Sequence, residues 1–275
     1  MPGAEIAIIG GSGFYQLLSD AVEEQVGTPY GPPSGPVTTG RIGGREVAFL
    51  PRHGPGHTLP PHRIPYRANM WALRALGVSR VLSPCAVGSL RADVHPGDLV
   101  VCDQFVDRTW GRPDTFFDGP DVRHVSVADP YCPELRAAAA AGLARGAGPA
   151  AAGRTVHDRG TVVVIQGPRF STRAESAWFR SAGWDVVNMT QYPEAPLARE
   201  LGMCFCGIAL VTDYDTGAEG IDGGEEIEAV TMEAVFQVLG SMVDTVRDAL
   251  RAVIDLIPPE RSCRCRSSTH PDFPG

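Results

Sequence analysis

The sequence contains no lysine, and all 24 basic residues among its 275 are arginine. This absence excludes chemistry that needs a lysine amine, such as a Schiff base, and it excludes a Walker-type phosphate loop. The 32 acidic residues bring the formal charge to −8. This charge argues against a nucleic-acid binder, because such proteins normally carry a basic surplus. An anionic ligand must therefore be met by a local cluster of Arg and His or by backbone N–H groups.

The sequence also lacks the signals of membrane insertion, secretion and disulfide bonding. No apolar run reaches the ~18 residues that span a bilayer. The first strand-like run follows the N-terminus without a basic leader, so we expect no signal peptide. The seven cysteines are odd in number and scattered, which is typical of reduced thiols. Together these features predict a cytoplasmic protein.

Short apolar runs alternate with helix-like stretches, and most runs end in Gly or small polar residues. Expected strands cover residues 5–9, 46–50, 80–82, 98–102, 161–165, 185–187 and 203–211, and expected helices cover 66–76, 134–145, 173–182, 192–201 and 225–257. This pattern predicts an α/β fold with one domain over residues 1–257, in which a mixed, twisted central sheet is flanked by helices. Residues 258–275 are polar and are predicted to form a flexible C-terminal tail.

Polar residues gather where the expected strands end. The first strand is followed by Gly10-Gly11-Ser12-Gly13, and the second by Arg52-His53. Two later strands lead into Asn188-Met189-Thr190 and Thr212-Asp213-Tyr214-Asp215. Ligands of open α/β sheets bind outside the carboxyl ends of the strands, so one shared cleft accounts for these clusters.

Two of these segments could bind an anion. The Gly-rich turn could present backbone N–H groups and the Ser12 hydroxyl, or it could be an ordinary turn. Residues 52–57 form the densest basic segment, in which Arg suits phosphate oxygens and His can add a donor. His53, His57 and His62 could instead bind a metal. Gly and Pro between them prevent a helix and no carboxylate or cysteine lies near, so we expect no metal.

The carboxylates and cysteines also have alternative interpretations. Asp213 and Asp215 could contact a heterocycle, or they could form a helix cap or a loop salt bridge. Cys204 and Cys206 alternate along an expected strand, face the same side and are interpreted as buried small hydrophobes. Cys263 and Cys265 are expected to be exposed, with thiol pKa values lowered by neighbouring arginines. A redox role for this pair is a hypothesis, and the alternative is that they reflect only the composition of the tail.

Seven segments, in this order along most of residues 5–250, resemble the methylthioadenosine phosphorylase branch of the trimeric purine nucleoside phosphorylases. They are IIGGSGFY (8–15), PRHGPGH (51–57), CAVGSL (85–90), GDLVVCDQFVDRT (97–109), QGPRFSTRAES (166–176), VVNMTQYPEAPLARELG (186–202) and TDYD (212–215). The resemblance implies a nucleoside phosphorylase-like fold and reversible phosphorolysis of 5′-methylthioadenosine. Inorganic phosphate would be a co-substrate and no cofactor would be needed. Specificity for adenosine or for 6-oxopurine nucleosides is the alternative.

The resemblance also implies which residues form the site. Phosphate would contact Ser12, Arg52, His53, the Cys85-Ala86 backbone and Thr190. The ribose would lie beside Asn188 and Met189, and the base would lie beside Phe170 and Ser171, with Asp213 and Asp215 as the catalytic carboxylates at its polar edge. The 5′ substituent would be surrounded by His124, Met232, Val235 and Phe236. The enzyme would be a homotrimer in which a neighbouring subunit supplies His124.

The chemistry of phosphorolysis agrees with this assignment. The sugar becomes oxocarbenium-like in the transition state while the departing purine gains negative charge. A protonated Asp213 could donate to purine N7 and contribute ~10²–10⁴-fold, which requires burial to raise its pKa. A carboxylate also accepts from the 6-amino group of adenine. Two functions of other classes remain open, a nucleoside-binding protein without turnover and a metal-dependent hydrolase built on the histidines.

Overall fold

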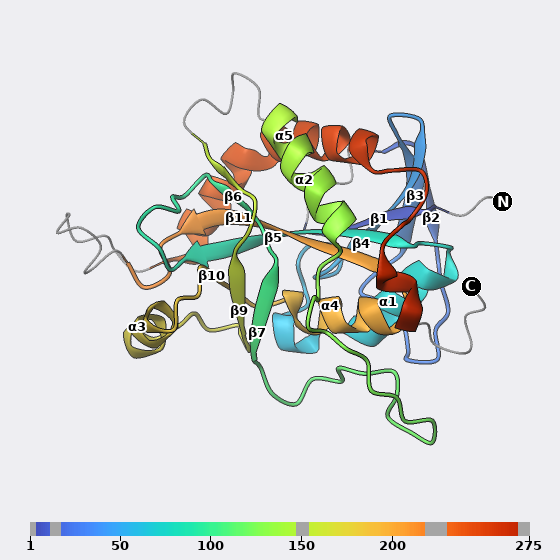
Figure 1. The fold of residues 1–275 in the computed structure, drawn as a ribbon, viewed down its shortest axis with the longest axis horizontal. Coiled ribbons are helices and arrows are strands. Elements are labelled where there is room, and N and C mark those ends of the chain that lie inside the picture. The colour runs from blue at the N-terminus through green and yellow to red at the C-terminus, as the bar shows by residue number, and fades with distance from the viewer. Residues whose placement is uncertain (1–3, 12–17, 147–153, 218–229, 269–275) are drawn as a thin grey trace.

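The computed structural model describes residues 4–11, 18–146, 154–217 and 230–268, and within them eleven strands form one mixed sheet (Figure 1). The strands are β1 (Ile6–Gly10), β2 (Ser19–Glu24), β3 (Val37–Ile42), β4 (Arg45–Pro51), β5 (Arg80–Ser89), β6 (Leu99–Val101), β7 (Gln104–Arg108), β8 (Val156–His157), β9 (Thr161–Ile165), β10 (Val186–Asn188) and β11 (Cys204–Asp213). Their order is β2-β3-β4-β1-β5-β10-β9-β7, while β11 pairs with β5 and β6, and β6 pairs with β8. Strands β1, β4, β5 and β11 run parallel, so their carboxyl ends meet at one edge.

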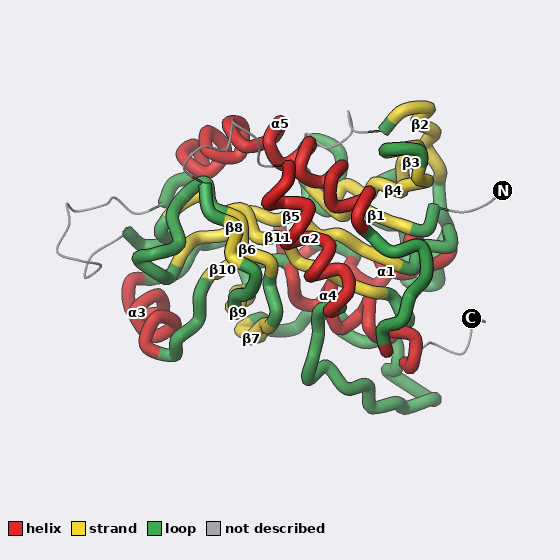
Figure 2. Tube along the Cα trace, turned by 45° about the horizontal axis from the view of Figure 1, so that its top comes forward, coloured by secondary structure: helices red, strands yellow, loops and turns green. Residues whose placement is uncertain are grey.

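Helices cover both faces of the sheet (Figure 2). They are α1 (Tyr66–Ala75), α2 (Pro133–Gly146), α3 (Arg173–Ser181), α4 (Gln191–Glu200) and α5 (Met232–Leu256), with short 3-10 helices η2 (Pro61–Arg63) and η4 (Arg264–Ser268). On one face α2 packs against α5, and on the other α1 packs against α4. No helix in the described parts of the chain is long and apolar enough to cross a membrane.

The strands supply side chains alternately to two hydrophobic cores. In β1, Ile6 joins the core beneath α2 and α5, whereas Ala7 joins the core beside α1 and α4. In β11, Cys204 and Cys206 belong to the first core and Phe205 to the second, which confirms that the two cysteines face the same side. Burial of both faces confirms the predicted α/β fold with a mixed, helix-flanked sheet.

Most expected elements are confirmed to within two residues at each end, and the differences have physical causes. The expected strand 80–82 continues to Ser89 because β5 pairs with β11 along almost its whole length. The described part of the closing helix begins at Met232, and residues 225–229 lie outside the described chain. Strands β2, β3, β7 and β8 were not expected. Strand β2 is almost entirely exposed and so carries no apolar signal.

Part of the C-terminal segment contacts the body of the protein, and the flexibility predicted for residues 258–275 stays a prediction. Residues 258–268 pack against the body of the protein, and Arg80 Nη2 donates to the carbonyl oxygen of Pro258 at 2.8 Å. Cys265 is only 2% exposed and Cys263 is half-buried, which corrects the expected exposure of both thiols. A hydrogen bond with the Cys132 thiol, together with burial, raises rather than lowers the pKa of Cys265. The remainder of the predicted tail lies outside the described residues, and the domain boundary at residue 257 stays a prediction.

The contact between α2 and α5 depends on a glycine. A Cβ atom at Gly142 would lie 2.5 Å from Val253 Cα. We therefore expect Gly142→Ala to lower the free energy of unfolding by about 1–3 kcal/mol in urea titrations, because the two helices must separate. Gly240→Ala is the matched control, since nothing lies within 4 Å of a Cβ at this exposed site in α5. It should stabilise the protein by about 0.5–1 kcal/mol. Equal effects of the two changes would contradict this packing argument.

Candidate active site

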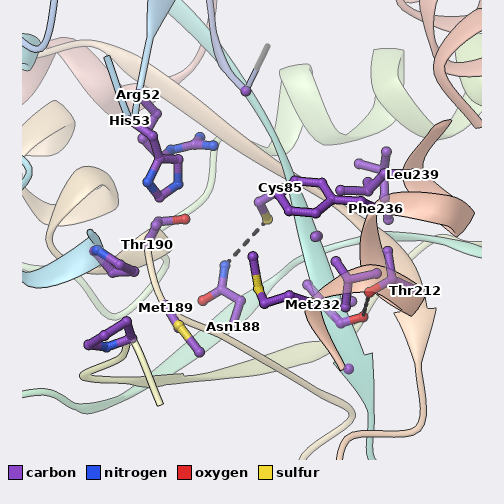
Figure 3. Close-up of a pocket in the computed structure, with 18 of the residues that line it drawn as sticks. Arg52, His53, Cys85, Asn188, Met189, Thr190, Thr212, Met232, Phe236 and Leu239 are labelled. Carbon is purple, nitrogen blue, oxygen red and sulfur yellow. Dashed lines mark hydrogen bonds between the residues drawn. The ribbon is translucent and has the colours of Figure 1, made fainter. Parts of the chain in front are cut away.

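A cavity of about 530 Å³ opens at the carboxyl ends of the parallel strands, between the sheet and α5. Figure 3 shows Arg52, His53 and Thr190 on one side of it and Met232, Phe236 and Leu239 on the other. The cavity therefore has a polar end and an apolar end. The predicted shared cleft is present, since the segments after β1, β4, β10 and β11 all contribute to its lining.

The cavity lies where β5 changes partners. One edge of β5 pairs with β11 over almost all its length, whereas the other edge pairs with β1 at residues 80–82 and with β10 at residues 88–89. Within the described residues, the second edge is therefore unpaired at residues 83–87. The carbonyl of Pro84 points to this open edge, where it accepts from Arg52 Nη1 at 3.1 Å. Backbone groups alternate along a strand, so Ala86 presents its N–H to the same edge and to the cavity that it lines.

Arg52 follows β4 and lies almost fully buried in the cavity wall. Its guanidinium pairs with Glu194 of α4, with 2.6 Å between Arg52 Nε and Glu194 Oε1. Its Nη2 donates to the carbonyl oxygen of Ile9 and to Ser83 Oγ, and its Nη1 donates to the carbonyl oxygen of Pro84. Nη1 carries two N–H groups and, within the described residues, keeps one for an acceptor in the cavity. Sequence reasoning missed Glu194, because nothing in the sequence marks it as the partner of Arg52.

His53 is uncharged at neutral pH. Burial, followed by the charge of Arg52, lowers the pKa of His53 to about 4. His53 Nδ1 lies 2.8 Å from the carbonyl oxygen of Leu59, which can only accept, so Nδ1 carries the proton. The Nε2 atom then presents a lone pair, which corrects the expectation that His53 adds a donor. His57 stacks on this ring with 4.2 Å between the centroids.

Asp213 sits at a β-bulge that ends β11 beside Gly88 of β5. Asp213 Oδ2 accepts from Thr212 Oγ1, and Oδ1 accepts from the backbone N–H of Asp215, both at 2.7 Å. Position 88 requires glycine because a Cβ there would lie 2.8 Å from Asp213 Oδ1. Burial raises the pKa of Asp213 to about 6, as expected from its place in the sequence.

Asp215 is the second buried carboxylate of the cavity. Its φ of +56° places it in the left-handed region, which non-glycine residues rarely occupy and which recurs at functional sites. Burial raises the pKa of Asp215, and the hydroxyls of Ser176 and Ser171 oppose this shift. Ser171 does not line the cavity. Ser176, on α3, was not expected from the sequence.

Cys85 and Asn188 form the floor of the cavity (Figure 3). The amides of Asn188 and Gln191 both donate to Cys85 Sγ at 3.3 Å, and burial raises the pKa of this thiol. Cys85 is thus a neutral packing group rather than a thiolate nucleophile. Asn188 Oδ1 is buried and has no partner among the described residues, so it can accept from a ligand. Thr190 caps α4 without using its hydroxyl, which is also available to a ligand.

The apolar end of the cavity is formed by α5 and is open to solvent. Met232 is 43% exposed and Phe236 is 51% exposed, whereas Val235 between them is buried. All three line the cavity, and so does Phe170 from the loop after β9. Phe236 also packs edge-on against His57, with 6.0 Å between the ring centroids.

Several expected residues are not part of the described lining of the cavity. Ser12 lies outside the described residues, whereas Gly11 before it lines the cavity. His124 is exposed in the long loop between β7 and α2 and does not line the cavity of its own chain. His62 is exposed and away from the cavity that His53 and His57 line, so the three histidines do not converge on a metal site.

The fold and the cavity define an α/β protein with a ligand pocket that has one polar end and one apolar end. The chain belongs to the phosphorylase superfamily, because the sequence model of that family matches residues 5–246. This membership makes it an enzyme of the nucleoside phosphorylase kind, a pentosyltransferase.

Individual relatives agree with this membership. The S-methyl-5′-thioadenosine phosphorylase of Mycolicibacterium smegmatis is 56% identical, covering 94% of this chain and 93% of its own. The purine nucleoside phosphorylase of Streptomyces coelicolor is 52% identical, covering 99% and 96%. The crystal structure of a methylthioadenosine phosphorylase from an Antarctic soil metagenomic library superposes with a TM-score of 0.89 at 40% identity, covering 98% of this chain and 92% of that one.

The buried pair in the cavity wall should dominate the stability of the site. Glu194→Ala leaves the Arg52 charge without its partner inside the protein, so we expect a loss of about 3–5 kcal/mol in the free energy of unfolding. Glu46→Ala is the control, because Glu46 forms an ion pair of 2.7 Å with Arg41 at the surface. That change should cost about 0–1 kcal/mol. A loss at Glu194 no larger than at Glu46 would show that the buried pair is not a structural support.

Proposed function

We propose that this chain catalyses the reversible phosphorolysis of 5′-methylthioadenosine to adenine and 5-methylthioribose 1-phosphate, with inorganic phosphate as co-substrate and no cofactor. The observation that carries this proposal is one cavity that is lined by a carboxylate of raised pKa, Asp213, by Arg52 at its polar end and by apolar residues of α5. These three environments fit the base, the phosphate and a 5′-methylthio group. The names of the mycobacterial and metagenomic relatives support the same reaction.

The polar end can bind phosphate without lysine. In this proposal the donors to phosphate are the remaining N–H of Arg52 Nη1, the N–H of Ala86 and the hydroxyl of Thr190, three residues that line the cavity. His53 Nε2 can accept the single P–OH proton of HPO₄²⁻, because its Nδ1 holds the ring proton. Ser12 and Cys85, the latter through its backbone, complete the proposed set. Donors held in place before the substrate arrives need no reorganisation during the reaction.

The reaction then requires one bond to form and one to break. A phosphate oxygen attacks the anomeric carbon of the sugar, the glycosidic C–N bond breaks, and its electron pair passes to the purine. Protonated Asp213 donates its proton to purine N7 and so stabilises the leaving base. Asn188 and Met189 hold the ribose, and Phe170 and Ser171 border the base in this proposal. The pKa of about 6 leaves about a tenth of Asp213 protonated at pH 7.

The carboxylates also favour a 6-amino purine. A carboxyl oxygen that carries no proton accepts from the amino group of adenine, whereas the oxygen of a 6-oxopurine would face it as a second acceptor. A buried mismatch of this kind can discriminate by ~10⁴. A 6-oxopurine or adenosine specificity is the second candidate, because the Streptomyces relative is named a purine nucleoside phosphorylase.

We further propose that a neighbouring subunit of a homotrimer covers the apolar end of the cavity. Met232 and Phe236 are too exposed to enclose a methylthio group within one chain. The loop between β7 and α2 projects from the body (Figure 1) and exposes Trp110, Val122 and Val127. It also carries His124, which could reach the cavity of a neighbour.

The seven free thiols support a reducing, cytoplasmic compartment.

One assay tests the function. Base release is followed from 5′-methylthioadenosine, adenosine and inosine, each with and without phosphate. We expect phosphate-dependent release that is fastest from 5′-methylthioadenosine. Binding without release would identify a nucleoside-binding protein, and phosphate-independent release that a chelator abolishes would identify a metal-dependent hydrolase. Either result contradicts the proposal, and faster release from inosine supports the second candidate.

Asp213→Asn should change the choice of base. The asparagine amide can donate to O6 of a 6-oxopurine, which the carboxylate cannot. We expect the ratio of kcat/KM for inosine to that for adenosine to rise about tenfold or more, while activity on both falls because the acid is lost. Thr212→Ser, which keeps the hydroxyl that bonds Asp213, is the control and should leave the ratio unchanged. An unchanged ratio in Asp213→Asn would remove Asp213 from base recognition.

The raised pKa of Asp213 predicts a pH dependence. Its acid form is present below about pH 6 and is lost as the pH rises through that value. Above it, kcat/KM of the wild type relative to Asp213→Asn should fall about tenfold per pH unit. Phosphate ionises in the same way in the assays of both enzymes, so its effect on kcat/KM cancels in the ratio. A ratio that stays flat from pH 5 to pH 8 would show that Asp213 does not act as an acid.

A further inference from the structure

Four cysteine thiols from distant parts of the chain meet at the end of β11 that is remote from the cavity. Cys132 directly precedes α2, Cys204 begins β11, and Cys263 and Cys265 lie before and within η4. Their four Sγ atoms all lie within 4.8 Å of one another. In the described parts of the chain this is the only group of His, Cys, Asp and Glu side chains so arranged. We call these residues the four-thiol cluster.

The spacing of the sulfurs fits a bound metal ion better than disulfides. A tetrahedral zinc site with Zn–S distances of about 2.3 Å places its sulfurs about 3.8 Å apart. Cys204 Sγ and Cys263 Sγ are 3.3 Å apart, well beyond the ~2.05 Å of a disulfide bond. All seven cysteines of the chain are free. Each thiol of the cluster also lies close enough to several others that no single pairing is favoured.

The surroundings of the cluster suit a negatively charged metal–thiolate group. Cys132, Cys204 and Cys265 are each at most 2% exposed and belong to the core beneath α2 and α5. Arg261 Nη1 lies 3.9 Å from Cys204 Sγ, and the charge of Arg80 acts on Cys204 as well. Four thiolates around one divalent ion carry a net charge of −2, which Arg261 offsets in part, since Arg80 is also paired with Glu5.

We propose that Cys132, Cys204, Cys263 and Cys265 bind one Zn²⁺ ion in a closed, structural site. Binding breaks four S–H bonds, forms four Zn–S bonds and releases four protons to solvent, without any change of oxidation state. Four protein ligands leave no open position for a substrate, so the ion would not take part in catalysis. The site would tie the C-terminal segment to the start of α2 and to β11.

The cluster is separate from the proposed active site. Cys204 and Asp213 stand at opposite ends of β11, and nine residues of extended strand span about 30 Å. Removal of zinc should therefore lower stability without altering the chemistry of the cavity. An experiment that contradicts the metal site would therefore not contradict the proposed function, and the reverse also holds.

The test uses the full-length protein, reduced, freed of metal with a chelator and kept without oxygen. We expect uptake of one zinc ion per chain, a higher melting temperature, and the absorption of tetrahedral cobalt thiolate when Co²⁺ replaces Zn²⁺. The kcat/KM for 5′-methylthioadenosine, measured well below the melting temperature, should be the same with and without zinc. Uptake of no metal by the reduced wild-type protein would overturn the proposal, and so would cobalt bound without thiolate absorption.

Substitutions of single cysteines test which residues bind the zinc ion. Cys132→Ser and Cys265→Ser should each lose the cobalt thiolate spectrum and bind zinc at least about tenfold more weakly. Cys206→Ser is the matched control, because Cys206 is buried on the same face of β11 but lies outside the four-thiol cluster. It should keep one tightly bound zinc ion. Equal loss in Cys206→Ser and Cys132→Ser would overturn the assignment, and the wild-type measurement decides the proposal if a variant does not fold.

Discussion

Arg52 and Glu194 form a buried ion pair that ties four separate segments of the chain together. Glu194 comes from α4, and Arg52 also bonds the backbone of β1 and β5 from its place after β4. Both charges lie out of water, so each depends on the other and on these hydrogen bonds. The pair therefore fixes α4 against β5 and holds Arg52 in the wall of the cavity.

Burial has a common effect on the titratable groups of the cavity. It lowers the pKa of His53 and raises the pKa values of Asp213 and Asp215, which moves all three toward their neutral forms. Arg52 is neutralised by its partner. In the proposed reaction the strongest charges would then belong to the substrates, an anionic phosphate and a sugar that becomes cationic. Their attraction is large in such a site because little water screens it.

The residues that sequence reasoning found share one property, which is their place at the end of a buried apolar strand. Arg52, Asn188, Thr190 and Asp213 follow such strands, and the structure brings all of them to one cavity. Glu194 was missed because it lies inside a helix and its role depends on a partner far away in the sequence. The same reason explains the four-thiol cluster, whose members looked like core residues of a strand or parts of a polar tail.

The amino-acid sequence alone is enough to predict that strands alternate with helices and that polar residues follow the strands. Its composition also requires that an anion be bound without lysine. These are local properties, set by the period of apolar residues and by composition. Only the folded structure shows which charges are paired and which carboxylates are desolvated. It also shows that one edge of β5 is unpaired between β1 and β10 in the described chain. Such properties depend on contacts between distant segments, and those contacts form only when the chain has folded.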